Sequence, residues 1–229
     1  MNDGLASADA AAHVLVLDVS APELSEADRH HLERVLRLRP GTIISVGDGH
    51  GSWRLMGLDR VLQPLGGVYR VEPESSPITI GVALTKGDKP ELVVQKLTEL
   101  GVDHIVLFPS SRSVARWDAD KVAYSLSRLR RVVDSAVCQC RRAWSPTVTF
   151  LPTFEEAVAL PSAALAAIGG EPYDADRHGA VLVGPEGGWT PRELAVSLPR
   201  VALGPHILRA ETAALTIAAV ACTTRYYRR

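Results

Sequence analysis

The sequence predicts two domains, a small β-barrel followed by a larger α/β domain with a mostly parallel sheet. Residues 1–72 contain short β-prone segments separated by turns, with one helical segment among them. From Ile78 onward, apolar strand-like runs alternate with helical segments, which is typical of a parallel α/β sheet. Residues 73–77 lie between the two regions, hold two prolines and lack large apolar side chains, so they are expected to form an exposed linker. The larger domain is then expected to span residues 78–229.

In the first domain, strands are expected at residues 14–19, 42–46, 53–58 and 67–71. The Gly-Asp-Gly-His-Gly stretch at residues 47–51 joins two of them and is a strong hairpin signal. One helix is expected over about residues 25–38. Short strands with a single helix suit a small barrel.

The larger domain begins with an expected strand at residues 78–84 and an amphipathic helix at residues 91–100, which Gly101 ends. A long helix is expected over about residues 118–138. The remaining strands are expected at residues 104–108, 148–150, 163–168, 180–183 and 201–203.

Two of these strands are followed directly by glycine and proline, in the motif Gly-Pro-Glu-Gly-Gly at residues 184–188 and in Gly204-Pro205. Proline disfavours the α region for the residue before it, so both strands end there. Glycine has no Cβ and lets the backbone approach a ligand closely, and ligands of α/β sheets bind beyond the carboxyl ends of the strands. The two loops therefore predict a pocket, although ordinary strand-to-helix turns carry the same residues.

Each loop leads into a helical segment. Residues 190–193, Thr-Pro-Arg-Glu, have the form of a capping box with proline at the first helical position. The second helix is expected to run from the second loop to Ala221. Its segment 213–221 is apolar nearly all round, which indicates burial on more than one side.

Composition indicates a globular chain without a global charge signal. Hydrophobic residues make up 46% of the 229 residues, and the formal net charge is −1, so any nucleic-acid surface must be a local patch. Residues 112–142 carry eight lysines and arginines against three aspartates, which fits either an RNA-binding stripe or a solvated face. Three cysteines without a metal-ligand spacing or a secretory signal indicate reduced thiols in a cytoplasmic protein. No apolar run reaches transmembrane length, and the Ala-rich residues 1–12 differ from a targeting peptide.

The two loops and their surroundings resemble one family. The motif at residues 184–188, with Leu-Gly-Pro at 203–205 and Leu-Arg-x-Glu-Thr-Ala at 208–213, is similar to bacterial 16S ribosomal RNA uridine-N3 methyltransferases (RsmE-like) of the SPOUT class. The resemblance covers nearly the whole chain. It implies a PUA-like N-terminal barrel that binds RNA, a C-terminal domain tied in a trefoil knot, and S-adenosylmethionine as the cofactor. It also implies a homodimer that acts on 16S rRNA of the 30S subunit, without a metal or a membrane.

The resemblance also assigns residues. It implies that the cofactor is held by residues of both loops and of the following helix, namely Leu182, Val183, Gly184, Pro185, Glu186, Gly187, Gly188, Leu203, Gly204, Pro205, Ile207, Leu208, Thr212 and Ala213. Through the His-His-x-x-Arg-Val-Leu-Arg-Leu segment at residues 30–38 and the basic segment at 112–142, RNA contact is implied for His30, Arg34, Arg37, Arg112, Arg116, Arg131 and Arg142.

Two positions depart from the family pattern. The first strand carries His13-Val14-Leu15 where an arginine and an aromatic residue are usual, which weakens any RNA role for that strand. Cys138 stands where a glutamate is usual, so a glutamate at that place has no part in the chemistry. These departures keep open a second hypothesis, a catalytically weakened RNA-binding protein of the same fold. A phosphate-binding enzyme is disfavoured because no lysine follows Gly187-Gly188.

Methyl transfer to uridine N3 requires loss of the N3 proton and stabilisation of the charge that spreads onto the uracil oxygens. Arg209 is expected to stabilise that charge, because a guanidinium is permanently protonated and holds its donors in a fixed fork. Glu211 is preferred as the general base, with Glu186 and proton loss to water as alternatives.

Overall fold

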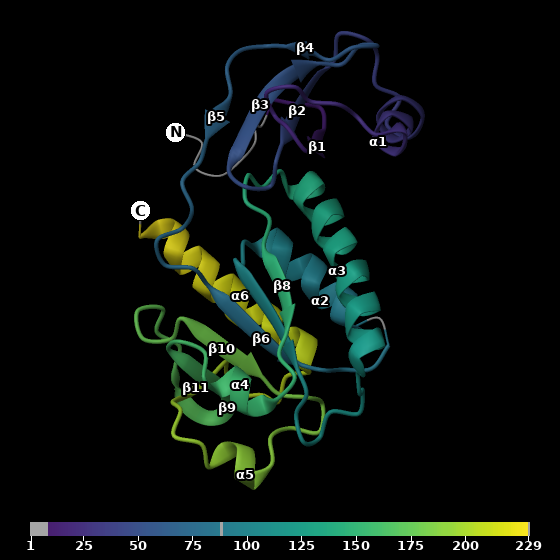
Figure 1. The fold of residues 1–229 in the computed structure, drawn as a ribbon. Helices are drawn as coiled ribbons and strands as arrows, with labels where there is room; N and C mark the ends of the chain where they lie inside the picture. Colours follow the sequence, from purple (N-terminus) through teal and green to yellow (C-terminus); the bar gives the residue numbers. More distant parts are fainter. Residues whose placement is uncertain (1–8, 88, 229) are drawn as a thin grey trace. The chain divides into compact units, whose positions relative to one another are not determined.

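The chain forms two compact units (Figure 1). The computed structural model describes residues 9–87 and 89–228, so most of the Ala-rich N-terminal stretch and Asp88 lie outside the described residues. The first unit contains the chain up to residue 74 together with residues 134–145, and the second contains residues 75–133 and 146–228. Residues 134–145, which the sequence places in the α/β domain, thus belong to the first unit.

The first unit is built on a five-stranded sheet. Strand β1 (His13–Leu15) pairs in parallel with β2 (Ile43–Gly47), and β2 pairs antiparallel with β3 (Ser52–Gly57). Strands β4 (Gln63–Pro64) and β5 (Tyr69–Arg70) pair with the two ends of β3. The core of this unit is apolar and includes Val14, Leu32, Ile44, Val46 and Met56.

The predicted hairpin between β2 and β3 is confirmed. Asp48 Oδ1 accepts hydrogen bonds from the backbone N–H groups of His50 (2.7 Å) and Ser52 (3.0 Å). Gly49 and Gly51 have φ values of +69° and +94°, which residues with a Cβ rarely adopt.

The helix expected at residues 25–38 is shorter and has two parts. Helix α1 (Glu26–His30) is capped by Ser25, whose Oγ accepts from the backbone N–H of Asp28 at 3.1 Å. It continues as a π-helical turn, η1 (His31–Val35). The chain then leaves the helix, and Arg37 has a φ of +55°.

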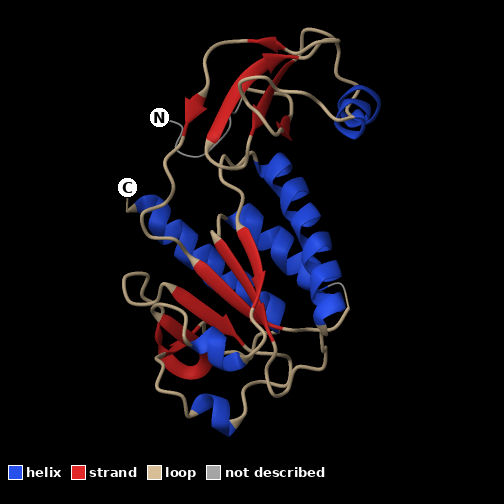
Figure 2. Ribbon diagram, viewed as in Figure 1, coloured by secondary structure: helices blue, strands red, loops and turns tan. Residues whose placement is uncertain are grey.

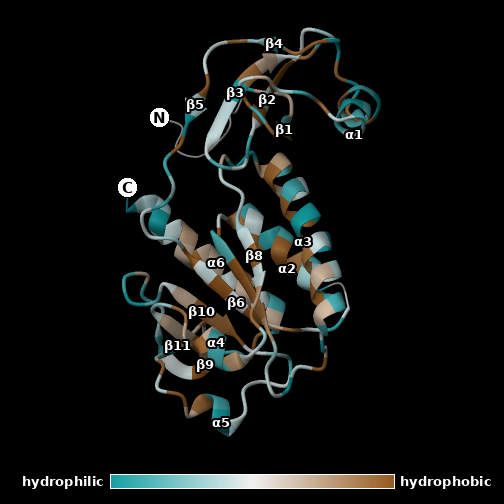
Figure 3. Cartoon of the chain, viewed as in Figure 1, coloured by the Kyte–Doolittle hydropathy of each residue, from teal (hydrophilic) through white to brown (hydrophobic). Residues whose placement is uncertain are grey.

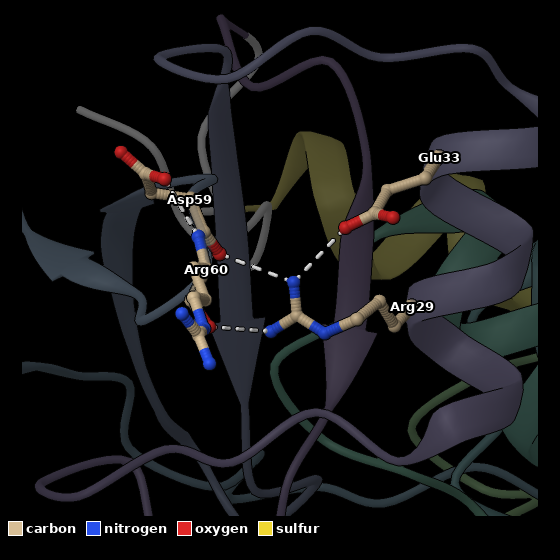
Figure 4. Close-up of polar contacts among 4 residues, drawn as sticks. All are labelled: Arg29, Glu33, Asp59 and Arg60. Carbon is tan, nitrogen blue, oxygen red and sulfur yellow. Dashed lines mark hydrogen bonds and ion pairs between the residues drawn. The ribbon is translucent and has the colours of Figure 1, made fainter.

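Arg29 ties this helix to the loop after β3 (Figure 4). Its guanidinium donates to Glu33 Oε1 at 3.0 Å and to the backbone carbonyls of Asp59 and Arg60, each at 3.1 Å. The two backbone carbonyls thus tie the helix that carries the predicted RNA contacts to this loop, whereas the pair with Glu33 lies within the helix itself.

The second unit confirms the predicted parallel sheet. Its six strands are ordered β11-β9-β10-β6-β7-β8, and every pairing between neighbours is parallel. The strands are β6 (Thr79–Ala83), β7 (His104–Phe108), β8 (Thr147–Phe150), β9 (Ala163–Pro172), β10 (Ala180–Val183) and β11 (Arg200–Ala202). The order of strands reverses between β6 and β10, and ligands of open α/β sheets bind at such a switch point.

Helices follow every strand of this sheet except β9 along the chain (Figure 2). They are α2 (Lys89–Leu100), α3 (Ala119–Cys140), α4 (Phe154–Val158), α5 (Pro191–Leu194) and α6 (Ala210–Tyr227). Helix α6 packs beside α2 and against β6 and β10, whereas α4 packs against β7. None of the helices in the described residues is long and apolar enough to cross a membrane.

The core of the second unit surrounds β10, whose four residues are all buried. Phe108, Leu165, Leu182 and Trp189 belong to one apolar cluster. The rings of Phe108 and Trp189 are stacked with centroids 6.3 Å apart. Figure 3 shows β10 in the brown colours of hydrophobic residues, in keeping with this burial.

Candidate cofactor pocket

A cavity of about 320 Å³ is lined by the loops that follow β10 and β11 and by part of β9. This volume lies at the lower end of the range of small-molecule pockets, about 300–1,000 Å³. The cavity is lined by nine of the residues that the resemblance assigns to the cofactor, namely Val183, Gly184, Pro185, Gly188, Leu203, Gly204, Ile207, Leu208 and Ala213.

The other five residues of that assignment do not line the cavity. Leu182 is fully buried in the core, where it packs against the backbone of Gly81. Glu186, Gly187, Pro205 and Thr212 are exposed.

Several lining residues were not expected from the sequence. Strand β9 contributes three of them, and the rest come from the loops and helices around it, the full set being Ala166, Ala167, Ile168, Trp189, Leu194, Arg200, His206 and Ala210. The sequence places a strand at 163–168 but gives no sign that it lies between β10 and β11, so its contribution depends on the observed strand order.

Glycine is required at positions 184 and 204, one in each loop, for different structural reasons. A Cβ on Gly184 would lie 2.9 Å from the indole ring of Trp189, so this glycine is needed for packing within the protein. Gly184 also lines the cavity, so packing against Trp189 is a second reason for glycine beside the expected approach of a ligand. Gly204 has a φ of +135°, and nothing lies within 4 Å of the position of its Cβ. A side chain there would enter open space in the cavity wall, which is the role expected of both glycines.

Side chains distant in sequence brace the first loop. Arg112 donates to the carbonyls of Gly187 (2.9 Å) and Trp189 (3.4 Å). The indole N–H of Trp189 donates to the carbonyl of Ala166 in β9 at 2.9 Å. Arg112, predicted to contact RNA, thus holds the backbone of the loop that lines the cavity.

The predicted capping box after this loop is confirmed. Thr190 Oγ1 accepts from the backbone N–H of Glu193, and Glu193 accepts from the backbone N–H of Thr190. The same buried carboxylate accepts from the hydroxyl of Ser110 and the N–H of Ser111, at 2.7 and 2.8 Å. Burial by itself raises the pKa of the Glu193 carboxyl, but these hydrogen bonds lower the pKa overall.

Lys89, at the start of α2, links the two candidate bases. Its Nζ lies 2.7 Å from Glu186 Oε1 and 3.6 Å from Glu211 Oε2. The hydrogen bond to Glu186 raises the pKa of Lys89, and the same bond lowers the pKa of Glu186. Within the described residues, the buried Glu211 Oε2 accepts no hydrogen bond, so one carboxylate oxygen there retains its acceptor capacity.

Arg209 lies at the start of α6, in the N-cap position with an extended backbone. Its side chain is exposed and makes no capping hydrogen bond, whereas its neighbours Leu208 and Ala210 line the cavity. Arg209 thus lies in the chain between two lining residues but does not itself line the cavity.

The predicted RNA-contact residues lie in both units. In the first unit, His30, Arg34 and Arg37 are exposed around α1 and η1, and Arg142 is half-buried. In the second unit, Arg112, Arg116 and Arg131 are exposed. Exposure suits contact with phosphate groups.

The two departures from the family pattern are both in the first unit. His13 is buried, and its Nδ1 lies 2.9 Å from Ser45 Oγ, so it belongs to the core and not to an RNA-facing strand. Burial, with a smaller effect of Arg141, lowers the pKa of His13 to about 4. Burial raises the pKa of the Cys138 thiol, so this side chain stays protonated at neutral pH.

The cavity fits an adenosyl group. Its wall combines glycine, proline and alanine with apolar side chains, and the missing Cβ at Gly204 leaves open space against the backbone. No three His, Cys, Asp or Glu side chains gather as a metal site within the part of the chain that the structure describes.

Comparison with known proteins identifies the family. Residues 72–222 match the RNA methyltransferase domain, and residues 24–55 match the RNA methyltransferase PUA domain. Ribosomal RNA small subunit methyltransferase E of Mycobacterium bovis is 33% identical over 86% of this chain and 84% of its own length. The protein of the same name from Synechocystis is 33% identical over 83% of this chain and 69% of its own length.

Solved structures agree with the sequence matches. A putative methyltransferase from Legionella pneumophila, in complex with S-adenosylmethionine, has a TM-score of 0.78 at 25% identity and covers 93% of this chain and 97% of its own. Ribosomal RNA small subunit methyltransferase E from Neisseria gonorrhoeae, bound to S-adenosylmethionine, has a TM-score of 0.74 at 25% identity with the same coverage. With its fold, its two matched domains and its relatives in agreement, the chain belongs to the ribosomal RNA small subunit methyltransferase E family, whose members are S-adenosylmethionine-dependent RNA methyltransferases.

Proposed function

We propose that this protein methylates N3 of a specific uridine in 16S rRNA of the small ribosomal subunit. The observation that carries the proposal is the cavity that the two Gly-Pro loops form beyond the carboxyl ends of β10 and β11 in the parallel sheet. Relatives with the same domains bear the name ribosomal RNA small subunit methyltransferase E. Uridine N3 as the target follows from the resemblance of the loop motifs.

When bound, S-adenosylmethionine supplies an activated methyl group on a sulfonium centre. Gly184, Pro185, Leu203, Gly204 and Leu208 are the residues proposed to hold its adenosyl part, since their backbone and apolar atoms line the cavity. Arg112 and Lys89 keep the first loop in place through Gly187 and Glu186. Holding both reactants in attack geometry removes much of the barrier to transfer.

The uridine N3–H proton must leave as the N3–methyl bond forms. Glu211 is the proposed acceptor of that proton, because its buried Oε2 accepts no hydrogen bond from any described residue. Glu186 is the alternative, and Lys89 lies within ion-pair distance of both carboxylates. Arg209 is proposed to stabilise the negative charge on the uracil oxygens as the proton departs.

The RNA is proposed to be held by exposed or half-buried cations of each unit. His30, Arg34, Arg37 and Arg142 serve in the first unit, whereas Arg116 and Arg131 serve in the second, with Arg112 shared between RNA and the first loop. Arginine–phosphate contacts position an RNA without reading its sequence. Residues 1–72 are proposed as the RNA-binding domain, 73–77 as the linker and 78–229 as the methyltransferase domain with the trefoil knot.

The protein is further proposed to act as a homodimer in the cytoplasm, where ribosomal subunits assemble. Helix α6 exposes Val220, Tyr226 and Tyr227, of which the two tyrosines have 65% and 80% of their surface accessible. An exposed apolar edge on this helix suits contact with a second copy.

The test is methylation of 30S subunits isolated from cells that lack this enzyme. Digestion to nucleosides and mass spectrometry should reveal N3-methyluridine that depends on S-adenosylmethionine. Arg209→Ala should lower single-turnover methylation by about 100-fold or more, with unchanged cofactor affinity by calorimetry. A methylated product other than N3-methyluridine would overturn the proposal, and full activity of Arg209→Ala would overturn the role of that residue.

A further inference from the structure

A second cavity, of about 450 Å³, lies in the second unit, and none of its lining residues lines the cofactor pocket. We call it the basic cavity. It is formed by the loop after β6, the start of α2, the loop after β7 and the first half of α3, with Thr85, Lys86, Gly87, Pro90, Glu91, Val114, Ala115, Arg116, Trp117, Lys121, Tyr124, Ser125, Arg128 and Leu129 as its lining.

The basic cavity has an excess of positive charge. Among the described residues that line it, Glu91 is the only acidic one, and Arg128 engages it through two contacts of 2.8 Å, from Nε to Oε1 and from Nη2 to Oε2. Lys86, Arg116 and Lys121 remain, and none of the three forms a salt bridge with a residue that the structure describes. Three cations at one cavity favour a bound anion.

Aromatic rings lie among these cations. Tyr124 has 58% of its surface exposed, and Lys121 Nζ lies 5.4 Å from the centroid of its ring. Trp117 is held in place by stacking on Phe150, with ring centroids 5.7 Å apart. Cations beside exposed aromatic rings are the combination by which proteins bind single-stranded nucleic acid, the rings stacking on bases and the cations contacting phosphates.

The basic cavity and the cofactor pocket lie at the same edge of the sheet. Lys86 follows β6, and β6 pairs in parallel with β10, whose following loop lines the cofactor pocket. The loop after β7 reaches both places, since Arg112 holds the first cofactor loop and Val114 to Trp117 line the basic cavity. A strand of RNA with its target base at the cofactor can therefore reach the basic cavity with a neighbouring nucleotide.

We propose that the basic cavity binds an unpaired nucleotide that adjoins the target uridine in the substrate RNA, with its base on Tyr124 and its phosphate among Lys86, Arg116 and Lys121. The proposal rests on the proposed function, because it takes RNA as the substrate. It adds a substrate subsite, which selects a single-stranded segment around the target.

The experiment uses the full-length protein and single-stranded oligouridylate of twelve nucleotides as the probe. Tyr124→Ala should weaken oligonucleotide binding by roughly 5- to 150-fold, the range for loss of one base stack. Tyr124→Phe retains the ring and should bind within about twofold of the wild type. Lys121→Gln should reduce the slope of log affinity against log salt by about 0.7, the value for one phosphate contact in a single strand.

Arg177→Gln provides the matched control for charge. Arg177 lies in the same unit, pairs with Glu171 and does not line the basic cavity, so its loss should leave RNA affinity and the salt slope unchanged. Cofactor affinity by calorimetry should be the same in all variants. Because Tyr124 is exposed, its truncation should also leave the melting temperature unchanged.

Two results would overturn the proposal. The first is wild-type oligonucleotide affinity in Tyr124→Ala together with a wild-type salt slope in Lys121→Gln. The second is equal binding of free uridine monophosphate and the oligonucleotide, with equal loss of both in Tyr124→Ala, which would make the cavity a site for free nucleotides. Failure of the wild type to form N3-methyluridine would overturn the proposed function, whereas oligonucleotide binding tests the cavity by itself.

Discussion

The buried histidine of β1 predicts how the stability of this protein depends on pH. His13 has 4% of its surface exposed, its Nε2 has no hydrogen-bond partner in the described residues, and its pKa is lowered from an ordinary 6.5 to about 4. Above pH 6.5 this histidine is neutral in both the folded and the unfolded chain. Between pH 6.5 and about 4, the unfolded chain binds a proton that the folded chain does not, so the free energy of unfolding falls as the pH is lowered.

The size of the effect follows from the shift. One pKa unit corresponds to about 1.36 kcal/mol, so the full shift of the His13 pKa lowers the free energy of unfolding by about 3 kcal/mol in total. About 2 kcal/mol of this is lost between about pH 7.5 and about pH 5, with the rest lost as the pH approaches the folded-state value. Burial is the main cause and the nearby positive charge of Arg141 the smaller one.

The assay is urea denaturation at about pH 7.5 and about pH 5, for the wild type, His13→Gln and His30→Gln. His13→Gln should lose about 2 kcal/mol less than the wild type over this change. His30 is exposed in the same unit, and its removal should preserve the wild-type loss. Taking differences between proteins cancels the titration of other groups. Hydrogen exchange of the β2 amide groups, which lie beside His13, locates the loss in the first unit. Equal pH dependence in the wild type and His13→Gln would refute this account.

Two further predictions concern the cofactor pocket. Lys89→Gln removes the hydrogen bond that lowers the pKa of Glu186, so the acid limb of the single-turnover pH–rate profile should move to higher pH; an unchanged limb would show that neither carboxylate needs this lysine. Gly204→Ala forces a side chain onto a backbone with φ of +135°, at a cost of about 1–3 kcal/mol, and should also abolish most cofactor binding. Gly66 has φ of +115° and equally open space, so Gly66→Ala is the matched control: it should lose similar stability and no cofactor affinity, and equal affinity losses would contradict the pocket assignment.

Local signals explain which elements the sequence predicts well. The strands at 104–108 and 180–183 are predicted at their observed bounds, because each is a short buried apolar run between turn residues. The first strand ends at Leu15, well before the predicted end at residue 19, since its pairing with β2 stops there. Helix α4 (Phe154–Val158) was not predicted, because a single turn capped by Thr153 leaves too short a periodic pattern.

The assignment of residues 134–145 to the first unit depends on contacts that a sequence does not reveal. Ala143 and Trp144 pack with Trp53 and Val71 in an apolar cluster. The indole N–H of Trp144 also donates to the carbonyl of Val71 at 2.9 Å. Trp144 and Val71 are 73 positions apart in the chain, and Trp53 is more distant still, so no local pattern of residues 134–145 indicates these partners.

In the candidate site, too, local motifs are predicted from the sequence and long-range contacts are not. The two Gly-Pro loops are local motifs, and most of the cavity wall that they form was predicted. The strand at 163–168 is predicted, but the contributions of β9 and Lys89 to the site are not, because they depend on strand order and on a contact across 97 positions. The packing of Gly184 against the indole of Trp189 is not predicted, because the sequence does not show that this ring folds back onto the start of its own loop.

The contacts that fix the cofactor loops come from the segments that line the basic cavity. Lys89, which holds Glu186 and lies near Glu211, directly precedes the lining residues Pro90 and Glu91. Arg112, which holds the carbonyls of the first loop, lies two residues before Val114 in the same connection. A nucleotide that orders the basic cavity therefore acts on the same short segments that hold the first loop and lie near Glu211 of α6, through contacts of a few ångströms. Substrate RNA and cofactor are expected to bind with positive coupling for this reason, and by linkage each must strengthen the other by the same factor.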